Sequence, residues 1–349
     1  MNVFRVHRAP LYGLLLCGLL LTLPAVAEEI SVATAGDGSV RLSLEPQPDA
    51  WPPRVGRQAL LSLEVNAHAL QWLNVPQRFA QIEHRSAAGD DVRTFSGSLR
   101  IPGDLGPEQG GLLDFSEEIR IDGARLLADY ELQTRGTVNL CGLQVSAYLD
   151  AGAFKGSQVL LSGVAKPPDG YKWEQWPLDT ITVVAAPKPA APAPGMPAPP
   201  AAADDEEKAD AEAVGEGADA PAEEDVEAPA EAPDAAVPAG VFTAAEPVTL
   251  AFAAAADDDN WQLFDGFCSE IRIAAPQGPP VTIKAPGVCR FVIQDNRKWG
   301  YDVFEVRLAF VMMDEGQQVT RDSVYTGKLE LSFGEDDTLK LSAAAPAEQ

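Results

Sequence analysis

The strongest constraint on the fold is a series of short segments in which apolar and polar residues alternate. Clear examples are Ala59–Ala67 (ALLSLEVNA), Leu126–Gln133 and Val303–Met312. Others are Arg93–Ile101, Glu117–Ile121, Leu143–Leu149, Ser157–Gly163, Asp179–Val184, Pro247–Ala253, Ser269–Ala275, Pro280–Ala285, Arg290–Asp295, Gly327–Phe333 and Thr338–Ser342. A period of two puts apolar side chains on one face of a strand, and Gly, Pro, Asp or Asn separate the segments. We therefore predict an all-β protein built as an antiparallel β-sandwich or two such sandwiches, with one short helix possible over Val75–Ala88.

A long segment of a different composition divides the chain. Residues 186–240 consist mainly of Ala, Pro, Glu and Asp, with 14 acidic residues against two lysines. Such a segment cannot bury enough apolar surface to offset the entropy of ordering, so we predict a disordered, extended linker. It separates a β-rich part at 28–185 from a second at 241–345. The sequence leaves open whether each part is a sandwich or both complete a single one.

The first 27 residues have the pattern of a secretory signal peptide. Arg5 and Arg8 precede the apolar run Leu11–Leu23, Pro24 ends that run, and Ala25-Val26-Ala27 supplies the small residues that signal peptidase requires. The run is too short for a membrane anchor, which needs about 20 apolar residues. We therefore expect an exported protein without a membrane span that works in the periplasm, on the cell surface or as a secreted protein.

Export bears on the cysteines, because disulfides persist in oxidising compartments. Cleavage after Ala27 would remove Cys17 and leave Cys141, Cys268 and Cys289. The 21-residue separation of Cys268 and Cys289 allows two neighbouring strands to bring them together, so this pair is our disulfide candidate. The alternative is three buried, reduced thiols.

The charge of the chain restricts its partners. The sequence contains 52 acidic and 26 basic residues, a formal net charge of −26. Phosphate backbones and anionic lipids repel such a chain, so we expect no nucleic-acid partner.

Catalytic motifs are missing from the sequence. There is no nucleophile elbow, zinc-protease motif or phosphate-binding loop, and the predicted mature chain has only two histidines, His68 and His84. Asp257–Asn260 and Glu335–Asp337 offer oxygen ligands of the kind that calcium uses, but without the spacing of a calcium loop, so we interpret both as polar turns. We assign no catalytic residue, no metal site and no cofactor.

Aromatic residues supply the candidate binding residues. Tyr171, Trp173 and Trp176 cluster in the sequence YKWEQW, and Trp299 lies in a second aromatic segment, near Tyr301. Flat aromatic faces stack well on the apolar face of a sugar ring. The alternative is that these rings fill the core or cover its edge.

Several segments resemble secreted β-sandwich domains that accompany polysaccharide-degrading proteins in environmental bacteria. The resemblance spans Phe115–Phe333 and rests on strand patterns and on Q-D-N-R-x-W-G at Gln294–Gly300; the acidic segment is an insertion. It implies one sandwich and association with glycans, and it identifies no catalytic residue. We therefore expect an exported, non-catalytic protein that binds a glycan or an envelope component. A polysaccharide-active enzyme and a structural or interaction protein of the envelope are the alternatives.

Overall fold

The protein consists almost entirely of antiparallel strands. The computed structural model describes residues 30–44, 59–89, 91–103, 110–171, 182–185, 241–276, 279–319, 323–334 and 341–343. Their strands join in one curled sheet, in which only β1–β19 and β12–β13 pair in parallel. The prediction of an all-β, antiparallel fold is confirmed. The predicted signal peptide and the segment 186–240 lie outside the described residues.

The elements are as follows, in chain order. The strands are β1 (Ile30–Thr34), β2 (Val40–Ser43), β3 (Leu61–Ala69), β4 (Leu73–Pro76), β5 (Gln81–Ala88), β6 (Val92–Arg100), β7 (Leu112–Asp122), β8 (Arg125–Arg135), β9 (Val138–Asp150), β10 (Gln158–Ser162), β11 (Ala165–Lys166), β12 (Thr182–Val184), β13 (Val241–Ala244), β14 (Val248–Ala251), β15 (Gln262–Ala274), β16 (Val281–Asp295), β17 (Val303–Val319), β18 (Val324–Phe333) and β19 (Leu341–Ala343). The short helical turns are η1 (Leu70–Trp72), η2 (Gln77–Phe79), α1 (Ala151–Phe154) and η6 (Asn296–Trp299).

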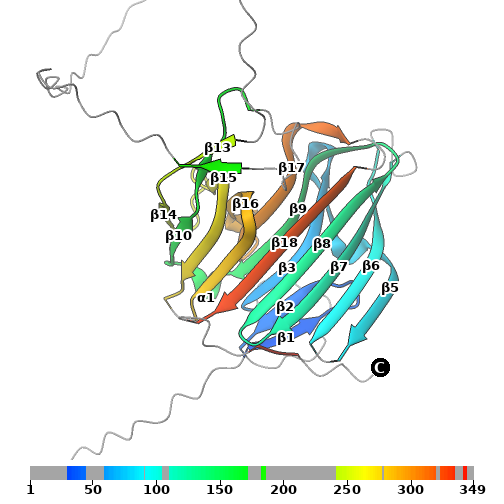
Figure 1. Cartoon of the computed structure of the whole chain (residues 1–349), viewed down its shortest axis with the longest axis horizontal. Coiled ribbons are helices and arrows are strands. Elements are labelled where there is room, and N and C mark those ends of the chain that lie inside the picture. The colour runs from blue at the N-terminus through cyan, green and yellow to red at the C-terminus, as the bar shows by residue number, and fades with distance from the viewer. Residues whose placement is uncertain are drawn as a thin grey trace, which may run out of the picture.

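Strand β16 divides the sheet into two branches. Its first residues, Val281–Lys284, pair with β18, and its last residues, Phe291–Asp295, pair with β17. The first branch continues through β18, β8, β7, β6 and β5, and the second through β17, β9, β3, β2 and β1. Figure 1 shows the first branch in front of the second. One hydrophobic core contains side chains from both branches.

Strands on the two sides of residues 186–240 pair with each other. Strand β17 lies between β9 and β16, with Val303 opposite Asp150 at one end and Val319 opposite Val138 at the other. Strand β18 pairs with β8 from Val324 to Ser332, and β15 pairs with β10. The sheet therefore combines the two β-rich parts, whose boundaries stay a prediction.

Two expectations about local structure are wrong. Val75–Ala88 does not form a helix: it ends β4, makes the single turn η2 and continues as the edge strand β5, because hydrogen bonds to β6 outweigh its local propensity. Pro280–Ala285 and Arg290–Asp295 are not separate strands but belong to β16. Pro286 lies between them, where a bulge interrupts the ladder to β15, and there the missing amide proton of proline is tolerated.

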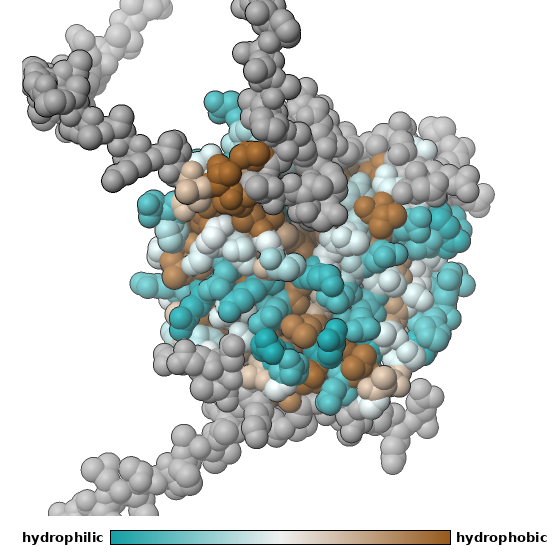
Figure 2. Space-filling model, viewed as in Figure 1, coloured by the Kyte–Doolittle hydropathy of each residue, from teal (hydrophilic) through white to brown (hydrophobic). Residues whose placement is uncertain are grey.

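The outer surface of the first branch is mainly hydrophilic, as Figure 2 shows over β18, β8 and β7, whereas apolar residues gather near β13 and β15. Its ion pairs include Arg135 Nη2 with Asp114 Oδ1 at 2.6 Å and Lys328 Nζ with Asp129 Oδ2 at 3.3 Å. These pairs are exposed, so each adds little stability. Among the described residues, no helix has the length and apolar character needed to cross a membrane.

The pairing of β17 with β9 predicts the result of cutting the chain between them. We expect a protease site engineered into residues 186–240 to yield two fragments that stay associated, because the ladders β9–β17 and β8–β18 and the shared core survive the cut. Size-exclusion chromatography after cleavage, without denaturant, measures this. Separate elution of two folded fragments would contradict the arrangement.

Candidate functional site

The second branch carries a band of polar side chains on the side that faces away from the core. In β3, Leu63 and Val65 enter the core, so Glu64 and Asn66 point to the opposite side, because side chains alternate along a strand. We call this band the polar face. Its members, on β3, β9 and β17, are Glu64, Asn66, His68, Gln144, Ser146, Tyr148, Glu305 and Arg307.

The register brings these side chains together across the three strands. Glu64 lies opposite Ser146, which lies opposite Arg307. Asn66 Nδ2 donates to the Tyr148 hydroxyl at 2.8 Å, although the two residues are 82 positions apart in the chain. Apart from Tyr148, which is partly exposed, all members are buried. Strands β3, β9 and β17 therefore carry the hydrophobic core on one side and a largely buried polar band on the other.

Glu305 is an ionised carboxylate at the centre of the polar face. It accepts hydrogen bonds from Ser146 Oγ at 2.7 Å, Asn296 Nδ2 at 2.7 Å and Arg307 Nη2 at 2.8 Å. Burial alone would raise the pKa of Glu305, but the Arg307 charge and these hydrogen bonds hold it below its usual value. A buried charge needs this degree of pairing.

Glu64 has the opposite character. Burial raises its pKa to about 7, and the hydrogen bond from Asn66 Nδ2 and the charge of Arg78 offset only part of this effect. Near neutral pH, Glu64 is therefore protonated in a large fraction of molecules and can donate a hydrogen bond. Burial, followed by the Arg307 charge, lowers the pKa of His68 to about 4, so His68 is neutral.

Several buried polar atoms of this region have no hydrogen-bond partner among the described residues. They are Asn66 Oδ1, Arg307 Nε, Asn296 Oδ1 and Gln294 Oε1. Gln294 lies opposite Glu305 on β16, so it borders the polar face. An unpaired buried polar group costs about 1–3 kcal/mol. These atoms are buried, so a polar ligand can supply the missing bonds only after neighbouring side chains move aside.

Trp72 lies over one end of the polar face in a strained backbone conformation. Its φ is +57°, and that of Gln71 is +58°, in the left-handed region that large side chains rarely adopt. Its ring meets His68 edge-on, with ring centroids 5.3 Å apart. Gly142 makes room for this arrangement, because a Cβ there would lie 3.3 Å from the Trp72 ring and 3.0 Å from His68 Nδ1. Strain of this kind costs about 1–3 kcal/mol and concentrates at functional sites.

The residues selected from the sequence lie elsewhere. Tyr171 packs edge-on against Phe242 and Phe267, at 5.4 and 5.7 Å between centroids, in a small cluster outside the polar face. Trp173 and Trp176 lie outside the described residues. Trp299 is 48% exposed and belongs to η6. The structure therefore does not bring Tyr171 and Trp299 into one site.

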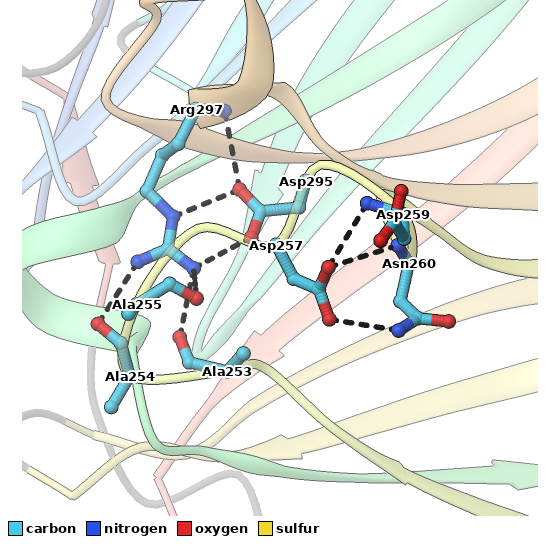
Figure 3. Close-up of polar contacts among 8 residues, drawn as sticks. All are labelled: Ala253, Ala254, Ala255, Asp257, Asp259, Asn260, Asp295 and Arg297. Atoms are coloured by element: carbon cyan, nitrogen blue, oxygen red, sulfur yellow. Dashed lines mark hydrogen bonds and ion pairs between the residues drawn. The ribbon is translucent and has the colours of Figure 1, made fainter.

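The acidic segment Asp257–Asn260 forms a turn. Asp257 Oδ1 accepts hydrogen bonds from the amides of Asp259 at 2.9 Å and Asn260 at 3.3 Å, and Oδ2 accepts from Asn260 Nδ2 at 2.8 Å (Figure 3). Across the described part of the chain, no group of three or more His, Cys, Asp or Glu side chains is placed to hold a metal ion. Glu335–Asp337 lies outside that part.

Sequence reasoning missed Glu64, Glu305 and Arg307. The only available signal was the alternation in LSLEVNAHA and VFEVRLAF, which predicts one polar side for each strand. It does not indicate that this side is buried. His68 carried no feature that distinguished it from His84, which is exposed on β5.

Comparison with known proteins assigns no family. No family model and no curated protein matches the chain. Among solved structures, a Synechocystis protein is 7% identical, with a TM-score of 0.38 over 88% of this chain and 92% of its own. A galactose mutarotase-related enzyme from Lactobacillus acidophilus is 6% identical, with a TM-score of 0.35 over 88% of this chain and 97% of its own. A galactose mutarotase-like protein from Lactobacillus casei is 9% identical, with a TM-score of 0.37 over 87% and 99%. At this similarity, the neighbours assign neither a family nor a ligand to this chain.

The raised pKa of Glu64 predicts a pH-dependent stability. The contribution of Glu64 to the free energy of unfolding is most favourable below pH 4.5, the pKa of this residue in the unfolded chain. This contribution is lost as the pH rises through about 7, the pKa in the folded protein, because between the two values Glu64 ionises more readily in the unfolded chain. From about pH 5 to about pH 8, we expect the wild type to lose about 2 kcal/mol more free energy of unfolding than Glu64→Gln. Urea unfolding at both pH values measures this. The exposed variant Glu131→Gln is the control, and a parallel decline of wild type and Glu64→Gln would contradict the prediction.

The structure places Cys268 and Cys289 directly opposite each other on β15 and β16, both as free thiols. Opposite residues of an antiparallel pair have Cα atoms about 4.5–5.5 Å apart, within the range that a disulfide spans. Burial raises the pKa of Cys268 to about 12 and that of Cys289 to about 11, so exchange in the folded state is slow. In protein recovered from an oxidising compartment, we expect denaturing alkylation to label Cys141 alone, as measured by peptide mass. Labelling of all three would contradict the disulfide.

Proposed function

We propose that the polar face binds a carbohydrate and that the protein is an exported, non-catalytic glycan-binding protein of the cell envelope or its surroundings. The observation that carries the proposal is the group of buried, unpartnered atoms Asn66 Oδ1, Asn296 Oδ1 and Arg307 Nε. A hydroxyl group both donates and accepts a hydrogen bond, so a hydroxyl-rich ligand can satisfy free acceptors and a free donor together.

The charge balance of the polar face favours an uncharged ligand. The Glu305 carboxylate and the Arg307 guanidinium compensate each other, His68 is neutral, and Glu64 is partly protonated near neutral pH. An anionic ligand would lack a free counter-charge in this buried setting, where an unpaired charge is costly, and a cationic ligand would meet only the partly protonated Glu64. The net charge of −26 further disfavours an anionic ligand.

Trp72 supplies the apolar part of the proposed site. A binding pocket combines apolar or aromatic surface with a few well-placed polar groups. The Trp72 ring is partly exposed and packs against His68 over Gly142, so it is ordered before a ligand arrives. One face of a sugar ring can pack on it while the hydroxyls meet the polar side chains.

A second candidate is a polysaccharide-active enzyme, and the two glutamates favour it. Glu64 is protonated in part and Glu305 is ionised, and a pair of carboxyl groups in different protonation states is what glycoside hydrolysis requires. Sugar release from a broad set of neutral polysaccharides by wild type, with none by Glu64→Gln, would support the enzyme. A lack of product despite binding would support the non-catalytic protein.

Replacing Trp72 tests carbohydrate binding with little risk to the fold. Glycine accepts a positive φ without strain, so Trp72→Gly removes the ring and also relieves the backbone. On a panel of neutral glycans followed by isothermal titration calorimetry, we expect Trp72→Gly to weaken binding by about tenfold or more. The matched control is Gln71→Gly, which relieves the same kind of backbone strain and keeps the ring. Equal affinity in both variants, or no binding of any glycan by wild type, would overturn the proposal.

A further inference from the structure

A second aromatic surface adjoins the polar face at the end where η6 follows β16. Trp261 and Trp299 meet edge-on, with ring centroids 4.8 Å apart. Trp299 is 48% exposed, and Tyr301, which follows the turn, is 62% exposed. We call Trp261 and Trp299 the aromatic shelf.

The Lys298 side chain holds the two rings of the shelf. Its Nζ lies 5.0 Å from the centroid of Trp261 and 5.7 Å from that of Trp299, and it donates to the Asp258 carbonyl oxygen at 3.0 Å. The ammonium is therefore already engaged with the rings and with the neighbouring loop. What the shelf offers to a ligand is the exposed part of the Trp299 ring.

The loop that carries Trp261 is fixed to η6 by Arg297. This guanidinium donates to the carbonyl oxygens of Ala253, Ala254 and Ala255 at 2.8–3.2 Å and forms a two-point ion pair with Asp295 (Figure 3). The backbone amide of Asp295 also donates to the Trp261 carbonyl oxygen at 2.7 Å. The pair is nearly buried, with side-chain exposures of 11% and 4%, so solvent weakens it little. The shelf is therefore ordered in advance.

Asn296 connects the shelf to the polar face. Its Nδ2 donates to Glu305 Oε2, while its Oδ1 is buried and has no partner among the described residues. Trp299 is one turn of η6 further on, about 6 Å along the axis at about 2 Å per residue. Gln294 Oε1, also without a partner, borders Glu305 from β16. Free polar atoms thus continue from the polar face to the base of the shelf.

We infer that the aromatic shelf is a second sugar subsite, so that the ligand is a linear, uncharged oligosaccharide with one sugar on the polar face and a later sugar stacked on Trp299. This inference rests on the proposed function. Unpartnered polar atoms run without a break from the polar face through Asn296 to the shelf. One oligosaccharide that occupies both places can pair with all of them, which favours a single ligand over two separate ones. A single sugar would leave either those near Asn66 or those near the shelf unpaired.

The length of the oligosaccharide separates the two subsites in an experiment. Isothermal titration calorimetry uses the disaccharide through hexasaccharide members of the cello-, manno-, xylo- and malto-series. For the series that binds, we expect Trp299→Ala to weaken hexasaccharide binding by about tenfold and to leave disaccharide binding unchanged. Trp72→Gly should weaken both. Trp299→Phe, which keeps a flat ring, should restore most of the hexasaccharide affinity.

Two controls make the result decisive. Val324→Ala removes an exposed apolar side chain from β18 and should change no affinity, and thermal unfolding shows that each variant is folded. Equal affinity of wild type and Trp299→Ala for the hexasaccharide would overturn the shelf subsite, while sensitivity to Trp72→Gly would leave the proposed function standing. Equal weakening of disaccharide and hexasaccharide by Trp299→Ala would also overturn it. If no member of any series binds to wild type, both proposals fail.

Discussion

The insertion of β17 between β9 and β16 is the constraint on which the rest of the structure depends. Its inward side chains, Phe304, Val306 and Leu308, belong to the core, and its outward side chains, Glu305 and Arg307, form the charged centre of the polar face. The hydrogen bond from Ser146 to Glu305 joins residues 159 positions apart. The pairing of β17, from the C-terminal part, with β9, from the N-terminal part, therefore completes both the core and the polar face.

Burial gives the two glutamates of the polar face different properties because their neighbours differ. Glu305 meets a guanidinium and two further hydrogen-bond donors, so its charge is retained at a depth where an unpaired carboxylate would be neutral. Glu64 has an amide and a more distant cation, which do not offset the loss of water. Replacing such a network by apolar side chains is often neutral or stabilising. Its presence is therefore weak evidence for a stabilising role.

Both ends of the proposed ligand path are ordered without a ligand, by different means. At one end, Trp72 packs against His68 in the space that Gly142 leaves free. At the other, Arg297 and Lys298 fix Trp261 and Trp299. Ordering a side chain on binding costs about 0.5–1.5 kcal/mol, so fixing the rings in advance preserves affinity. Carbohydrate recognition benefits from this, because each hydroxyl exchanges a hydrogen bond with water for one with protein.

The sequence by itself determined the all-β class and most of the strands, because period-two alternation reports which side of a strand is apolar. It also indicated that Cys268 and Cys289 lie on neighbouring strands, and the fold places them directly opposite each other. It could not show that β16 changes partner along its length, since pairing depends on distant residues. Nor could it separate Glu64 and Glu305 from the other acidic residues of this chain. Only the tertiary structure decided that, because the pKa and the role of a carboxyl group depend on burial and on neighbours that lie far apart in the chain.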